Sequence, residues 1–283
     1  MDRTRIIFIT IIGLGLCVVG GIIASSFVSQ FTGGQNGGDD GSQIELPSGS
    51  VLVTLASSNT KRNWLDQVTA EFNAVGMSTS SGSPIVVDVS HVTSGGSMNA
   101  ILDGDLQPTA WSPGDQSWVA QANETWRQRN NKPIASETCA PTIYAPLGFA
   151  MWRPMAETLG WPDEPIGWDT IVELAADPDG WASYGRPEWG QFRFGHTHPG
   201  YANSGLLSMT GFVYGVTGQT TDLTAADIYM PEVEEAMRAL EEVTAKYGRQ
   251  APALLELMAQ QGPGYLHAAA VPEADTVRSA LGR

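Results

Sequence analysis

Four segments of the chain share one pattern: a short apolar run ends in small polar residues, and these lead into an amphipathic stretch with helical period. The apolar runs are Val51–Ala56, Ile85–Val89, Thr109–Trp111 and Phe192–Phe194. The polar turns after them are Ser57–Thr60, Thr93–Ser97, Ser112–Asp115 and Gly195–Pro199. The amphipathic stretches are Trp64–Phe72, Met98–Leu102, Trp118–Trp126 and Leu206–Tyr214. Strand, polar turn and helix in this order are typical of a parallel α/β sheet.

The remaining pattern predicts a second group of elements, reached through an extended crossover. Thr138–Trp152 is rich in β-formers and contains Pro141 and Pro146, which exclude a helix. Further helices are expected at Pro154–Leu159, Trp168–Ala175, Val233–Lys246 and Pro252–Gln260, and a strand at Tyr265–Val271. The tail Glu273–Arg283 is polar and shows no sheet pattern.

These elements predict a two-lobed α/β protein with an amino-terminal extension. We expect a signal-anchor or transmembrane helix over residues 1–28, a flexible Gly-rich tether over 29–49, a first α/β lobe over 50–138, an inter-lobe crossover over 139–152 and a second lobe over 153–283.

The first residues of the chain predict contact with a membrane. Arg3 and Arg5 precede the uncharged run Ile6–Val28, whose length matches the ~20 residues needed to cross a bilayer. The positive-inside rule then places the rest of the chain outside the cell membrane. Ala24-Ser25-Ser26 also offers a cleavage site, so the segment is either an uncleaved single-pass anchor or the signal of a secreted protein.

Charge and motifs exclude several classes of function. The net charge of −15 argues against nucleic acid as a partner, because phosphate binding needs clustered Lys and Arg. The chain has no GxSxG elbow, Walker A sequence, HExxH or Rossmann GxGxxG pattern, so we expect no enzyme and no cofactor. His196 and His198 have the spacing of two metal ligands on a strand, but no second cluster completes a site, and no metal is predicted.

The polar turns supply the candidate ligand contacts, since ligands of open α/β sheets bind at strand carboxyl ends beside helix amino termini. In the first lobe and the crossover the candidates are Ser57, Ser58, Asn59, Thr60, Ser94, Gly95, Gly96, Ser97, Trp111, Ser112 and Tyr144. In the second lobe they are Thr197, His198, Asn203, Ser204 and Gly205. Each also has a structural interpretation that stays open here: helix cap, glycine turn, core filler or hinge packing.

Several stretches resemble a known family. They are Ala56–Leu65, Ala100–Gly114 (AILDGDLQPTAWSPG), Ala150–Trp168 (AMWRPMAETLGWPDEPIGW), Phe194–Leu207 (FGHTHPGYANSGLL) and, more faintly, Gly262–Ala269. With these the chain resembles bacterial extracellular solute-binding proteins of the type II periplasmic-binding-protein fold. It is most similar to a membrane-anchored group whose longer members carry a von Willebrand factor A-like domain.

The resemblance implies a receptor that holds a small polar or oxyanion solute between two lobes, for ABC-type transport or sensing with a membrane permease. Similar proteins return to the first lobe after the region of Tyr265, and no such strand follows Pro272. We therefore expect the binding fold to be incomplete at its carboxyl end. Two other classes of function stay open: a cell-envelope interaction module without a small ligand, and a hydrolase that uses Ser and His.

Overall fold

The amino-terminal part of the fold is built on a parallel sheet. In this computed structural model, which describes residues 46–279, the sheet has the strand order β2-β1-β3. Its strands are β1 (Val51–Ser58), β2 (Ile85–Val92) and β3 (Ala110–Ser112). Val51 lies opposite Ile85 and Leu55 opposite Ala110, and both pairings are parallel. The predicted parallel arrangement is thus confirmed for these strands.

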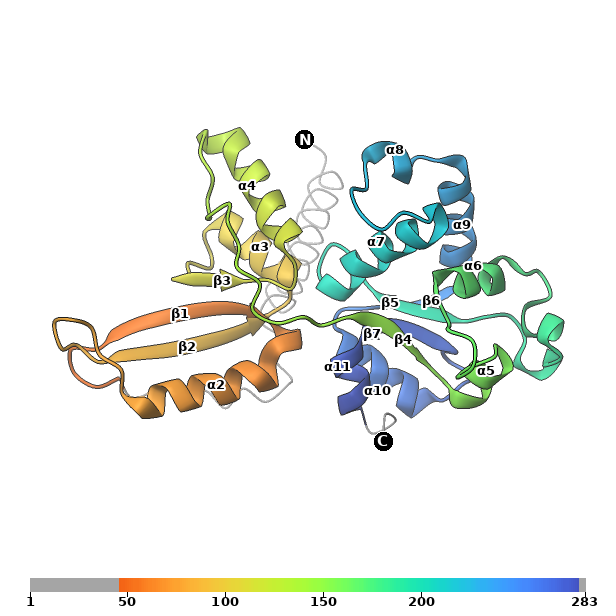
Figure 1. Cartoon of the computed structure of the whole chain (residues 1–283), viewed down its shortest axis with the longest axis horizontal. Helices are drawn as coiled ribbons and strands as arrows, with labels where there is room; N and C mark the ends of the chain where they lie inside the picture. The colour runs from red at the N-terminus through yellow and green to blue at the C-terminus, as the bar shows by residue number, and fades with distance from the viewer. Residues whose placement is uncertain (1–45, 280–283) are drawn as a thin grey trace, which may run out of the picture. The chain divides into compact units, whose positions relative to one another are not determined.

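Helices cover both faces of this sheet. Helix α2 (Arg62–Val75) lies on one face, and α3 (Ser94–Asp103) and α4 (Gln116–Asn130) lie on the other (Figure 1). A 3-10 turn, η1 (Asn59–Lys61), leads directly from β1 into α2. Met98, Trp118 and Ala122 form the core beneath α3 and α4. Because α3 ends at Gly104 with a φ of 83°, a conformation that favours glycine, the chain turns back towards β3 at once.

The carboxyl-terminal part is built on a mixed sheet of order β4-β7-β5-β6. Its strands are β4 (Leu147–Met151), β5 (Phe194–Thr197), β6 (Thr244–Gly248) and β7 (Ala268–Pro272). β7 is antiparallel to β4 and parallel to β5. Every residue of β5 and β7 is buried, as expected for central strands covered on both faces.

Two hydrophobic clusters hold the helices against this sheet. Helices α6, α7 and α9 lie on one face, around Phe194, Phe212 and Leu240, and α10 and α11 lie on the other, where Leu254 and Leu266 are buried (Figure 1). The elements of this part, besides its strands, are α5 (Arg153–Thr158), α6 (Trp168–Ala176), η2 (Gly180–Tyr184), η3 (Pro187–Trp189), α7 (Asn203–Thr217), α8 (Ala225–Ile228), α9 (Pro231–Val243), α10 (Ala251–Gln261) and α11 (Glu273–Arg278).

Two predicted elements need correction. The strand expected at Phe192–Phe194 is instead Phe194–Thr197, so residues predicted as a polar turn are buried inside the sheet. The helix expected to reach Lys246 ends at Val243, because Thr244–Gly248 pairs with β5 as strand β6. Pairing with a buried strand outweighs the weak helical preference of these residues. The tail, which shows no sheet pattern, forms the helix α11 after Pro272.

Only some of the predicted domain limits fall among the residues that the structure describes. The membrane helix over 1–28 and most of the tether over 29–49 lie outside the described residues. Within residues 46–279 we find no helix that is both long enough and apolar enough to span a bilayer. Ser48 onwards forms one unit that contains both sheets. The lobe boundaries at 138 and 152 stay predictions; the chain has no regular element from 131 to 146 and enters β4 at Leu147.

Candidate ligand-binding site

A cavity of about 1160 Å³ lies at the carboxyl ends of β1 and β3. Its walls come from the end of α3 and the loop before β3, from the turns after β1 and β3, and from the beginning of α4. The irregular segment 134–145, the strand ends at Leu147 and Pro272, and Asn203 and Leu207 of α7 complete them. Six of the predicted contacts line it: Ser58, Thr60, Trp111, Ser112, Tyr144 and Asn203. The cavity therefore lies where ligands of open α/β sheets bind.

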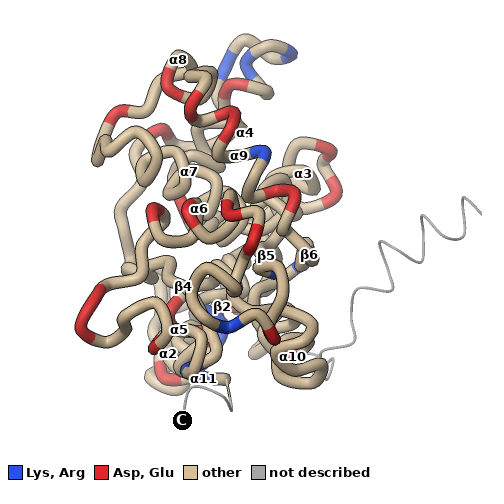
Figure 2. The backbone as a smooth tube through the Cα atoms, turned by 90° about the vertical axis from the view of Figure 1, so that its right-hand side faces the viewer, with Lys and Arg blue, Asp and Glu red and all other residues tan. Residues whose placement is uncertain are grey.

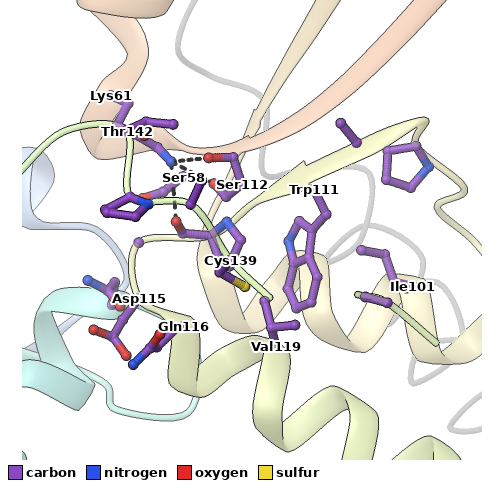
Figure 3. Close-up of a pocket in the computed structure, with 18 of the residues that line it drawn as sticks. Ser58, Lys61, Ile101, Trp111, Ser112, Asp115, Gln116, Val119, Cys139 and Thr142 are labelled. Carbon is purple, nitrogen blue, oxygen red and sulfur yellow. Dashed lines mark hydrogen bonds between the residues drawn. The ribbon is translucent and has the colours of Figure 1, made fainter. Parts of the chain in front are cut away.

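Lys61 is the residue of this cavity that the sequence analysis missed. It ends η1, and its Nζ donates to the carbonyl oxygen of Ser112 at 2.8 Å, to Ser112 Oγ at 2.5 Å and to the carbonyl oxygen of Pro113 at 3.2 Å (Figure 3). Among residues 46–279 no carboxylate lies within ion-pair distance of this ammonium. Burial lowers the pKa of Lys61 to about 8, so the side chain stays mostly charged at neutral pH.

The run Ser57–Thr60 divides between the interior and the cavity. Ser58 is 2% exposed and lines the cavity, and the described part of the chain gives its hydroxyl no hydrogen-bond partner. Thr60 lines the cavity as well. The hydroxyl of Ser57 donates to the carbonyl oxygen of Ser58 at 3.4 Å, and neither Ser57 nor Asn59 lines the cavity. Of this run, Ser58 and Thr60 are the residues in place to contact a ligand.

An aromatic wall faces the polar residues. Trp111 stands in β3, and its Nε1 donates to Ser97 Oγ at 2.9 Å. Figure 3 shows the indole between Ile101 and Val119, on the side of the cavity away from the Lys61 ammonium. The bond to Ser97 fixes the ring orientation. The role of Ser97 in the structure is thus to hold Trp111, while Tyr144, which is 86% exposed, lies at the rim.

The amino terminus of α3 does not open into the cavity. Ser94 Oγ accepts from the backbone N–H of Gly114 at 2.9 Å, and the N–H of Gly95 donates to the carbonyl oxygen of Tyr201 at 2.8 Å. A Cβ at Gly95 would lie 2.3 Å from the carbonyl oxygen of Gly200. Glycine at 95 therefore permits a close approach of two backbone segments. A Cβ at Gly96 would meet Thr93 Oγ1 at 2.6 Å, within the same turn.

The second-lobe candidates are mostly bonded to one another. Thr197 Oγ1 and Ser204 Oγ are 2.6 Å apart, and a Cβ at Gly205 would lie 2.2 Å from the carbonyl oxygen of Thr197. His198 is exposed and its Nδ1 accepts from the N–H of Gly200 at 3.1 Å. Of the five candidates in this part, Asn203 alone lines the cavity. The structure does not bring the hydroxyls of Ser58, Ser97 and Ser204 together at one cavity.

Asp115 and Cys139 are the potential metal-ligating side chains among the residues that line the cavity. No group of three His, Cys, Asp or Glu side chains that could hold a metal ion occurs within residues 46–279. Asp115 lines the cavity, but its Oδ1 accepts from the N–H of Ser117 at 2.8 Å and so caps α4. Cys139 is exposed and lines the cavity from the irregular segment.

Comparison with known proteins finds similar structures but no match in sequence. No protein-family model matches it, and no curated protein is detectably similar in sequence. The sulfate-binding protein SubI from Mycobacterium tuberculosis H37Rv is 14% identical with a TM-score of 0.49, and the alignment covers 80% of this chain and 66% of that one. A periplasmic thiamin binding protein is 13% identical with a TM-score of 0.50, with 80% of this chain and 64% of that one covered.

These comparisons establish the fold and nothing finer. The likeness to the thiamin-binding protein shows that the chain has an α/β fold of the periplasmic binding-protein kind. The chain spans less than two thirds of that protein's length. The resemblance to the group with a von Willebrand factor A-like domain and the expected incompleteness of the carboxyl end stay predictions.

Proposed function

We propose that this chain is an extracytoplasmic solute-binding receptor, which holds a small polar or anionic solute and serves ABC-type transport or sensing. The observation that carries the proposal is the cavity at the carboxyl ends of β1 and β3, which Ser58, Lys61 and Ser112 line together with Asn203 of α7. This is the position of ligands in open α/β sheets. The fold shared with a thiamin-binding protein supports the same class of function.

The binding residues of the proposal are the six predicted contacts that line the cavity, together with Lys61. Of the other candidates, Gly95 belongs to the contact between α3 and the loop before α7, and Ser204 is hydrogen-bonded to Thr197 beside that loop. They reach a ligand only when this contact opens, as in the hinge motion of two-lobed receptors. This contact is closed in the structure, so the proposed binding site is the cavity.

The setting of the receptor follows from the amino-terminal sequence. Arg3 and Arg5 before the apolar run Ile6–Val28 support an extracytoplasmic position for the globular part, held by an uncleaved anchor or released after cleavage. A membrane permease is then the natural partner of a transport receptor. A place among the membrane-anchored proteins with a von Willebrand factor A-like domain belongs to the same proposal.

The proposal is one of binding without catalysis. Within residues 46–279 no histidine nitrogen is hydrogen-bonded to a serine hydroxyl, the arrangement that a Ser–His hydrolase needs. The polar groups of the cavity include hydroxyls, the amides of Gln107, Gln116 and Asn203, a thiol, an ammonium and a carboxylate that caps a helix. Such groups orient a solute and provide specificity.

A calorimetric panel tests the proposal directly. The full chain is titrated with sulfate, molybdate, thiamin, amino acids, sugars and small carboxylates, and at least one is expected to bind. Ser58→Ala should then weaken binding by about twofold to tenfold, the loss of one buried hydrogen bond. The matched control is Ser90→Ala, an exposed serine of β2 outside the cavity. If no solute binds, the function is an interaction module instead.

A further inference from the structure

The cavity has a charged end and an apolar end. Lys61, Ser58 and Ser112 lie together where β1 and β3 finish (Figure 3). Trp111, Ile101 and Val119 form a wall away from them. A ligand that contacts both ends has a polar head and an apolar body.

The positive charge at the polar end has neutral partners. All three acceptors of Lys61 Nζ are carbonyl or hydroxyl oxygens. The only other charged residue among those lining the cavity is Asp115, whose carboxylate already caps α4. A partly buried cation without a counter-charge is stabilised by an anion that enters beside it.

Two serine hydroxyls beside this cation can donate hydrogen bonds to a ligand. Ser112 Oγ accepts a hydrogen bond from Lys61, which leaves its own O–H to donate. Residue Ser58 is 2% exposed and lines the cavity, and its hydroxyl has no hydrogen-bond partner among the described residues. Two O–H groups and an ammonium match the acceptor oxygens of a carboxylate or a similar acidic group.

The size of the cavity separates an organic from an inorganic anion. Its volume of about 1160 Å³ exceeds the roughly 300–1,000 Å³ that encloses drug-sized ligands. A bare tetrahedral oxyanion fills a small fraction of such a volume and leaves the Trp111 wall uncovered.

The overall charge of the chain does not favour an anionic ligand. The net charge is −15, and Figure 2 shows many more acidic than basic residues along the backbone. Recognition of an anion therefore depends on a local cation.

Resting on the proposed receptor function, we propose that the ligand is an organic anion, with its acidic group at Lys61, Ser58 and Ser112 and an aromatic or aliphatic body against Trp111, Ile101 and Val119. Lys61 is the residue that determines this specificity. The charge selects the acidic head, and the apolar wall selects a body larger than an inorganic ion.

Three matched probes test the head group by calorimetry on the full chain: 3-phenylpropionate, its neutral amide 3-phenylpropionamide, and the cation 3-phenylpropylamine. The carboxylate is expected to bind at least about tenfold more tightly than the amide, and the amine more weakly than either. Lys61→Met should remove the preference for the carboxylate and leave the affinity for the amide unchanged. Lys132→Met, at an exposed lysine outside the cavity, is the matched control.

A pH titration of the unsubstituted lysine covers the case in which Lys61→Met fails to fold. The affinity for 3-phenylpropionate should fall between pH 7 and 9, as the ammonium loses its proton, while that for the amide stays constant. Asp115, Cys139 and Tyr144 are the other titratable groups lining the cavity. The titration uses a Cys139→Ser background, because a thiol ordinarily titrates near pH 8.5.

Each alternative result overturns the inference in a recognisable way. Equal affinity for carboxylate and amide removes the role of the charge. Tighter binding of sulfate than of 3-phenylpropionate, lost in Lys61→Met, replaces the organic anion with an inorganic one. Failure of all three probes at millimolar concentration overturns the inference but leaves the receptor function standing if another solute of the panel binds; failure of the whole panel overturns both.

Discussion

The Nε1–H of Trp118 donates a 2.8 Å hydrogen bond to Oδ1 of Asn203. Trp118 belongs to α4, which packs on the amino-terminal sheet, and Asn203 begins α7, which packs on the carboxyl-terminal sheet. The bond lies next to the one between Gly95 N–H and the Tyr201 carbonyl oxygen. Together they join the helices that follow strands of two different sheets, at the edge of the candidate site.

Asn203→Leu should destabilise the protein by leaving the Trp118 N–H buried without an acceptor. The expected loss is about 1–3 kcal/mol in the free energy of unfolding, measured by urea denaturation. Asn99→Ala serves as the control, since Asn99 is an exposed α3 residue whose side chain makes no hydrogen bond to the described residues. A loss no larger than that of the control would mean that the indole N–H finds water instead.

Gly95→Ala should also destabilise, although alanine normally favours a helix by roughly 0.5–1 kcal/mol over glycine. The new Cβ would lie 2.3 Å from the carbonyl oxygen of Gly200, so α3 and the 199–201 loop have to move apart. Overpacking of this kind costs about 1–3 kcal/mol. Thermal and urea denaturation measure the change, and Gly264→Ala, where no atom lies within 4 Å of the new Cβ, should be close to neutral. A stabilised Gly95→Ala protein would falsify the close approach.

Much of the first half of the fold was predictable, because each strand there is a contiguous apolar run followed by its own turn. β6 was not, since Thr244–Gly248 continues the helical pattern of α9 and becomes a strand only through pairing with β5. The α11 tail likewise gains its order from packing on β4 and β7.

The candidate site was predictable in location but not in detail. Strand ends and polar turns pointed to Ser58, Ser112 and Asn203, which line the cavity. Lys61 follows the run Ser57–Thr60 directly, but its partner Ser112 is 51 residues away in the chain. The N–H of Gly95 donates to the backbone carbonyl oxygen of Tyr201, in another part of the fold. A bond between two backbone groups cannot be predicted from the pattern of side chains.

His267 should make stability depend on pH. Burial, with a smaller contribution from the charge of Arg193, lowers the pKa of His267 from 6.5 to about 4, and its Nδ1 accepts from Trp181 Nε1 at 2.9 Å and from the N–H of Arg193 at 3.1 Å. The unfolded chain therefore binds a proton that the folded chain resists. This contribution is fully present above about pH 6.5 and is lost as the pH falls towards 4.

The matching experiment compares urea denaturation at pH 7 and pH 5. The unfolding free energy should be lower at pH 5, and His267→Gln should reduce the difference between the two values because glutamine does not titrate. His198→Gln, at an exposed histidine, is the control and should keep the difference of the unsubstituted protein. An equal pH dependence in all three proteins would assign the effect to other groups.

Asp115→Asn separates the structural and electrostatic roles of one residue at the cavity. Asp115 caps α4 through its bond to the Ser117 N–H, and asparagine is an equally good cap, so the free energy of unfolding should change by less than about 0.5 kcal/mol. The substitution removes the one negative side chain that lines the cavity. If the ligand is an organic anion, its affinity should rise by about twofold to fivefold, because a like charge near the site is gone, and the gain should shrink at high salt. Calorimetry with 3-phenylpropionate at low and high ionic strength measures both effects.

Asp103→Asn, at the exposed end of α3 and outside the cavity, controls for the change in net charge. Weaker binding of the anion by Asp115→Asn at unchanged stability would show that the carboxylate itself contacts the ligand, which would then carry a donor or a positive charge.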